Sequence, residues 1–181
     1  MSQITMLVDG LKSNLCELEA ELPAKNLPYL WDPQPYEELD NPEALPSHKA
    51  FSLIEKIKTD LKAIEALVTP NHFKLFELGN LQFKVAALNA AVTLDLAGEL
   101  SKLGGQASLH ELAEKVNANE HKLGIVPWVA SWLCDLDVTG RILRTLAAEY
   151  IFQEVSPDVF KHTRHSTALA GFGARSFLTF M

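Results

Sequence analysis

The sequence predicts a mainly α fold, a helical domain that contains a helix-turn-helix and a small β-wing. Two observations carry this prediction. Apolar residues recur at steps of three and four over much of the 181-residue chain, which is the period of amphipathic helices. Aromatic and β-branched residues gather around a turn signal in one short segment near the carboxyl end, which predicts one small hairpin.

The first predicted helix covers residues 4–22. Its apolar residues form a single stripe made of Ile4, Leu7, Val8, Leu11, Leu15, Leu18 and Leu22. Pro23 ends this helix, because proline has no backbone N–H to continue the hydrogen-bond ladder. Residues 23–46 hold six prolines with Asp and Asn between them, and this composition predicts an extended connector.

A second helix is predicted over about residues 47–68. Its apolar residues alternate steps of four and three, the spacing of a seam between two helices, and they are Ala50, Ile54, Ile57, Leu61, Ile64 and Val68. Thr69 followed by Pro70 then indicates the start of another helix, which we expect to end at Gly79.

The following segment, residues 81–103, is rich in Ala and Leu on adjoining faces, so we expect a helix packed on both sides. Gly104 and Gly105 end it. Ser108 with Glu111 three residues later predicts a capping box that starts a short helix over residues 109–116. This order is helix, turn, helix.

The wing is predicted as a strand at residues 150–155, a proline turn at 156–158 and a returning strand at 159–163. Residues 166–181 again carry apolar side chains at roughly helical spacing, interrupted by two glycines. These apolar side chains need a surface to cover them.

Taken in order, the Ala-rich helix, the glycine turn and the segments SLHELAEKVNANEHKL, GRILRTLAAEYIFQEV and FKHTRHSTAL resemble the N-terminal dimerisation domain of S-adenosylmethionine-dependent O-methyltransferases. The fungal secondary-metabolism branch is the most similar. The likeness covers residues 73–169 well and the first two helices loosely. It implies a helical dimerisation domain with a winged helix-turn-helix. In full-length members this domain precedes a Rossmann-like domain that holds S-adenosylmethionine and a catalytic histidine.

With this resemblance, the chain divides into three predicted parts. Residues 1–68 form a dimerisation arm of N-terminal helices and proline-rich connector, 69–165 form the winged-helix-like dimerisation domain, and 166–181 begin a truncated interdomain helix. Residues 125–140 are predicted to be an insert, a retained intron or a recent insertion. Removing them joins Leu123 to a helical stripe that includes Ile142, Leu143 and Leu146, so we expect their deletion to preserve stability.

No catalytic, cofactor-binding or metal-binding residue is predicted in this chain. A methyl-donor site of the Rossmann type needs a glycine-rich turn between a strand and a helix, whereas the close glycine pairs here follow helical patterns. The six histidines are scattered, and His162 with His165 is interpreted as a surface pair beside Arg164. We therefore expect an O-methyltransferase-like protein of secondary metabolism that is inactive alone.

The expected partners follow from the resemblance, in which the N-terminal helices interlock with a second subunit. We expect a homodimer, or a heterodimer with a full-length methyltransferase. The predicted interface residues are Leu7, Leu11, Leu15, Leu18, Ile54, Ile57 and Leu61.

Charge and cysteine content bear on the remaining classes of partner. Sixteen Lys and Arg against 23 Asp and Glu give a net charge of −7, which disfavours nucleic acid and anionic membrane. Two cysteines, Cys16 and Cys134, favour a reducing cytoplasmic setting, and no membrane span is predicted. The alternative function is a winged-helix DNA-binding regulator that would use Lys122, Arg141 and Arg144.

Overall fold

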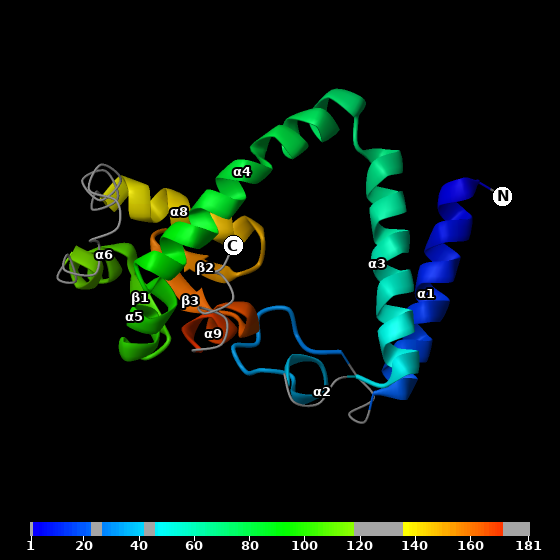
Figure 1. The fold of residues 1–181 in the computed structure, drawn as a ribbon, viewed down its shortest axis with the longest axis horizontal. Helices are drawn as coiled ribbons and strands as arrows, with labels where there is room; N and C mark the ends of the chain where they lie inside the picture. Colours follow the sequence, from blue (N-terminus) through cyan, green and yellow to red (C-terminus); the bar gives the residue numbers. More distant parts are fainter. Residues whose placement is uncertain (1, 23–26, 42–45, 118–135, 172–181) are drawn as a thin grey trace. The chain divides into compact units, whose positions relative to one another are not determined.

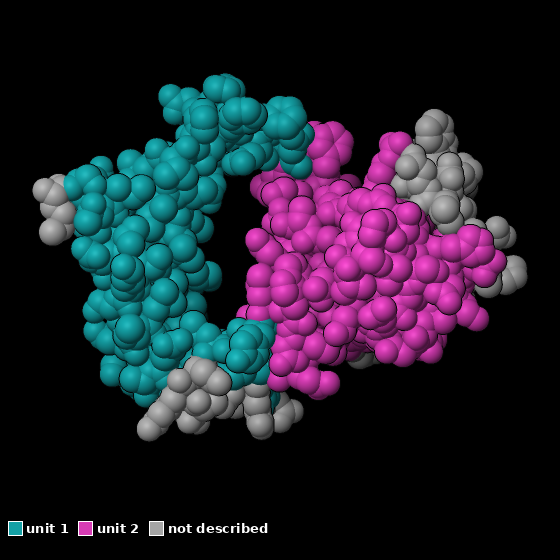
Figure 2. Space-filling model, turned by 180° about the vertical axis from the view of Figure 1, so that it is seen from behind, with its two compact units in different colours: residues 1–29, 36–80 teal, residues 30–35, 81–181 magenta. Residues whose placement is uncertain are grey.

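The computed structural model describes residues 2–22, 27–41, 46–117 and 136–171 (Figure 1). These residues form a mainly helical protein with one small antiparallel sheet, which confirms the predicted fold class. The chain separates into two compact units, coloured in Figure 2. Unit 1 is Met1–Tyr29 with Tyr36–Asn80, and unit 2 is Leu30–Pro35 with Leu81–Met181.

Unit 1 is built on a pair of antiparallel helices, α1 (Gln3–Glu21) and α3 (His48–Val68), which lie side by side (Figure 1). Each begins at a serine whose hydroxyl accepts a backbone N–H, Ser2 from Thr5 at 3.3 Å and Ser47 from Ala50 at 3.1 Å. Both predicted helices are confirmed. The connector also contains α2 (Glu37–Asp40), a single helical turn. This turn was not predicted, because the prolines on both sides indicated an extended segment.

The apolar stripes of α1 and α3 face each other and form the core of unit 1. The buried residues of this core are Leu18, Leu22, Ala50, Leu53 and Ile57. Polar contacts flank it, with Asn14 donating to Asp60 at 3.2 Å and Lys49 pairing with Glu21 at 2.9 Å. The seam predicted from the steps of three and four is thus filled within one chain at Ala50, Ile54 and Ile57, whereas Leu61 and Val68 are exposed.

The next helix, α4 (Asn71–Thr93), runs without interruption through Gly79. The prediction that a helix ends at Gly79 is therefore wrong. One glycine in a helix costs only about 1 kcal/mol relative to alanine, and no proline stands beside it to remove a hydrogen bond. The break comes later, at Asp95, which adopts a left-handed conformation (φ 57°) and caps α5 (Leu96–Lys102) by accepting the Gly98 N–H at 3.1 Å. The predicted continuous helix over 81–103 is corrected accordingly.

Unit 2 continues through the glycine turn into β1 (Gln106–Ser108), α6 (Leu109–Asn117), α8 (Leu136–Ala148), β2 (Phe152–Ser156), β3 (Val159–His162) and α9 (Arg164–Ala170). The helix-turn-helix and the two-stranded wing are as predicted. The capping box is present, with the Ser108 N–H donating to Glu111 Oε2 at 2.8 Å and the Glu111 N–H to Ser108 Oγ at 3.3 Å.

The sheet has the order β1-β3-β2, and both pairings are antiparallel. β1 was not predicted; it pairs Gln106 with Lys161 and Ala107 with Phe160. The core of unit 2 lies between this sheet and the helices, and its fully buried large side chains include Leu96, Leu100, Leu112, Leu143, Leu146, Phe152 and Phe160.

The expected insert, residues 125–140, lies outside the described residues as far as position 135. Its last residues, 136–140, form the start of α8, where Thr139 is 1% exposed and Gly140 is buried. A Cβ added at Gly140 would lie 3.0 Å from Leu109 Cδ2, so this position lets α8 approach α6 closely. Of the segment 166–181, residues up to Ala170 belong to α9, and residues 172–181 lie outside the described part, so the interdomain helix stays a prediction.

Within the described ranges, none of the helices combines the length and the apolar character that crossing a bilayer requires.

Candidate association surface

The residues predicted to form the dimer interface lie in three different environments. Leu18 and Ile57 are buried in the α1–α3 core. Leu11, Leu15 and Ile54 are half-buried and pack against it. Leu7 is half-buried, and Leu61 is 50% exposed. A single chain therefore covers much of this set, and its role between two chains stays a prediction.

A larger uncovered apolar area lies on α4. We call this area the α4 apolar surface and define it by its large exposed side chains, which are Phe73, Leu75, Phe76, Leu78, Leu81, Phe83 and Val85. Leu75 and Phe76, at 71% and 67%, are among the most exposed. The exposed end of α3, Leu67 and Val68, precedes it in sequence.

The apolar residues of α4 are distributed around its circumference, which is typical of a helix that is buried on several sides. In this chain alone the carboxyl-terminal part is covered, with Ala87 and Ala91 buried. The amino-terminal part is exposed. The charges beside it are matched within the chain, because Lys74 pairs with Glu65 and Lys84 pairs with Glu149. The surface is thus apolar with locally neutralised charges, a composition suited to contact with another protein.

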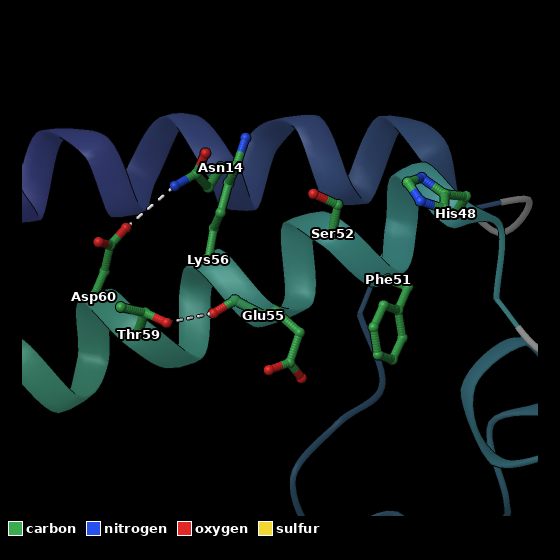
Figure 3. A pocket seen from close by; sticks show the side chains of 8 residues that line it. All are labelled: Asn14, His48, Phe51, Ser52, Glu55, Lys56, Thr59 and Asp60. Carbon is green, nitrogen blue, oxygen red and sulfur yellow. Dashed lines mark hydrogen bonds between the residues drawn. The ribbon is translucent and has the colours of Figure 1, made fainter.

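An open groove of about 610 Å³ lies along α3 in unit 1 (Figure 3). Most of its side chains extend from α3, and Asn14 points from α1 toward Asp60; together they do not converge on one point (Figure 3). Several of them are already engaged, since Asp60 accepts from Asn14 and the Thr59 hydroxyl donates to the backbone oxygen of Glu55 at 2.8 Å. This groove offers no arrangement of acid, base and nucleophile.

His162 is buried, so the prediction of a surface histidine pair is wrong. Its ring lies between two hydroxyls, with Nε2 2.9 Å from Ser101 Oγ and Nδ1 2.8 Å from Ser166 Oγ. His165, in contrast, is exposed. Burial lowers the pKa of His162, because removal from water disfavours the charged imidazolium. The ring is a neutral link between α5, β3 and α9.

The described glycines and strands differ from the arrangement that a Rossmann-type site for S-adenosylmethionine uses. Gly104 and Gly105 lie between a helix and a strand, the reverse of the strand-to-helix order that a methyl-donor site of the Rossmann type uses. In the described part, both strand-to-helix junctions, Ser108–Leu109 and His162–Arg164, lack glycine, and every strand pairing is antiparallel. Across the same ranges, no group of three His, Cys, Asp or Glu could hold a metal ion.

The residues named for DNA contact are not available as a basic stripe. Arg144, on α8, lies 3.3 Å from Glu154 through Nε and 2.5 Å from Asp158 through Nη2. Arg141 also has a partner in the structure, and Lys122 lies outside the described residues. Binding to DNA phosphates needs cationic side chains that are free to displace counterions. The described residues therefore do not favour the DNA-binding alternative.

A helix-turn-helix unit with a small wing and an uncovered apolar helix defines a class of protein, the helical association module. The comparison with known families gives the particular family. The model of the O-methyltransferase dimerisation domain matches residues 76–171, more than half of the chain. The chain therefore belongs to the O-methyltransferase dimerisation domain family, which confirms the resemblance seen in the sequence. A search of curated proteins finds no match.

The matched segment begins within α4 and ends at Gly171, directly after α9. It contains Phe76, Leu78, Leu81, Phe83 and Val85 of the α4 apolar surface. The sequence analysis placed the predicted interface on α1 and α3 and did not single out the exposed side chains of α4. The available signal was the spread of apolar residues around the whole helix, which exceeds what one packing face requires.

Proposed function

We propose that this chain is an association module of an O-methyltransferase-like protein and that its α4 apolar surface binds a second copy of the chain. The observation that carries the proposal is the exposure of seven large apolar side chains along one helix, five of them inside the family match. Monomeric proteins rarely leave so many large apolar side chains of one helix in water.

The energetics support a dimer. Fully burying one large apolar side chain contributes roughly 1.5 to 3 kcal/mol. The side chains of the α4 apolar surface are each more than half exposed. Burying the exposed part of one of them therefore contributes roughly 1 kcal/mol. Seven side chains from each of two copies then contribute on the order of 10 kcal/mol or more. This is comparable with the cost of association, roughly 4 to 15 kcal/mol.

The same surface can pair with a full-length O-methyltransferase that carries a similar helix, which gives a heterodimer. The sequence resemblance to the fungal branch supports a role in secondary metabolism. In this proposal the 181 residues by themselves supply no methyl transfer. The antiparallel strand pairings and the glycine-free strand-to-helix junctions of the described part support this. Calorimetry tests that point: the chain alone is expected to show no saturable heat with S-adenosylmethionine, and micromolar binding would contradict it.

Association through α4 is tested with two differently tagged copies of the full chain, expressed together and captured by one tag. We expect both tags to be recovered for the unchanged chain and only one for Phe76→Glu, because a buried carboxylate opposes association. Met6→Glu is the matched control, since Met6 is 63% exposed on α1 and lies outside the surface. Equal recovery from the unchanged chain and Phe76→Glu would overturn the proposal.

A further inference from the structure

A second cavity, of about 410 Å³, lies in unit 2 beside the sheet. We call it the wing pocket. Four segments line it: the extended stretch at Pro33 and Gln34, the end of α5 with its glycine turn, the first residue of β1, and the β3–α9 junction. Its volume falls within the range of roughly 300 to 1,000 Å³ that is typical of small-molecule sites.

The wing pocket has one positively charged side chain, Lys161, and several neutral polar side chains that can donate a hydrogen bond. Gln106 on β1 and Lys161 on β3 are direct cross-strand partners, so their side chains leave the same face of the sheet. The described lining contains no carboxylate. Elsewhere Lys49, Lys58 and Lys102 pair with acids, whereas the Lys161 side chain has no ion pair or hydrogen bond in the described structure. In a chain of net charge −7, this is a local site of positive charge.

Two consecutive glycines keep one wall of the wing pocket bare. Gly104 and Gly105 have φ angles of 88° and 85°, a left-handed conformation that favours glycine. A Cβ at Gly104 would meet nothing within 4 Å, and one at Gly105 would lie 3.6 Å from His162 Cδ2. The space beside both glycines is therefore open, although their positive φ angles would strain any side chain placed there.

The remaining polar groups of the pocket are fixed. Burial lowers the pKa of His162, which holds the ring neutral between Ser101 and Ser166, so Lys161 is the charged group of the lining. The Thr167 hydroxyl donates to the Pro33 carbonyl oxygen at 2.9 Å. This contact ties the extended stretch, which forms part of the lining, to α9.

We infer that the wing pocket binds a small organic carboxylate, with its oxygens on Lys161 Nζ and the side-chain amides of Gln106 and Gln34. One unpaired ammonium group with neutral amide donors matches a single negative charge, which favours a monocarboxylate over a phosphate dianion. This inference does not depend on the proposed association, because the α4 apolar surface supplies none of the lining residues.

The test follows the backbone amide signals of Gly104 and Gly105 by NMR in the full chain. Benzoate is the probe, benzamide is its neutral counterpart of the same shape, and inorganic phosphate is the second anion. We expect saturable shifts with benzoate, with a dissociation constant on the order of 1 mM, and none with benzamide. Equal shifts with benzamide, tighter binding of phosphate, or no shift with benzoate would each overturn the inference.

Variants at Lys161 connect the shifts to the pocket. Lys161→Met, which removes the charge and keeps the length, is expected to weaken benzoate about tenfold or more, and Lys161→Arg is expected to retain it. Lys62→Met makes the same change at an exposed position of unit 1 and is expected to leave binding unchanged. Benzoate binding that survives Lys161→Met, or that is lost equally in Lys62→Met, would contradict the site.

Discussion

At the scale of single residues, the buried polar groups of unit 2 are arranged around His162. Ser166 is completely buried and belongs to a capping box with Thr163, so one hydroxyl serves both the start of α9 and the histidine ring. Ser101 reaches the ring from α5. The histidine therefore joins two helices to the sheet while it is uncharged, and this arrangement makes stability depend on pH.

The sign of that dependence follows from the lowered pKa of His162. As pH falls through about 6.5, the unfolded chain takes up a proton that the folded chain resists, so the free energy of unfolding decreases. We expect His162→Gln to show a smaller loss of stability between about pH 8 and pH 5.5 in denaturant titrations. His72→Gln, at an exposed histidine, is the control and should follow the unchanged chain. Parallel curves for all three proteins would contradict this account.

At the scale of elements, helix starts and ends were predictable where local chemistry sets them. Ser47, Ser108 and the pair Gly104–Gly105 act within a few residues of themselves, and the structure places them as the sequence indicated. The break at Asp95 was not predictable in this way. Aspartate tolerates the left-handed conformation but does not require it. The packing of α5 in the core of unit 2 decides that the chain turns at Asp95.

The α1–α3 pair gives a prediction about packing. Leu53 is 4% exposed in the core of unit 1, whereas Leu67 on the same helix is 48% exposed. We expect Leu53→Ala to reduce the free energy of unfolding by about 2 to 5 kcal/mol, and Leu67→Ala by about 0.5 kcal/mol or less. Both are measured by denaturant titration in the Phe76→Glu background, so that association does not contribute. Equal losses would show that α1 does not cover Leu53.

At the scale of the whole molecule, the sequence predicted the class of fold and the family but not the location of the uncovered surface. A stripe such as Leu11, Leu15 and Leu18 has the same pattern whether its partner is another helix of the chain or a second chain. Only the structure shows that α3 faces it. Likewise, β1 has only one apolar residue in three, and it forms a strand because it pairs with β3. The burial of His162 also follows from this tertiary arrangement.

The central claim is that the chain associates through the α4 apolar surface. Sedimentation equilibrium of the unchanged 181-residue chain, across micromolar concentrations, tests it most directly. The account predicts a mass twice the 20.0 kDa of one chain, and a return to 20.0 kDa for Phe76→Glu with the helical circular dichroism retained. A mass of 20.0 kDa for the unchanged chain at every concentration would contradict it.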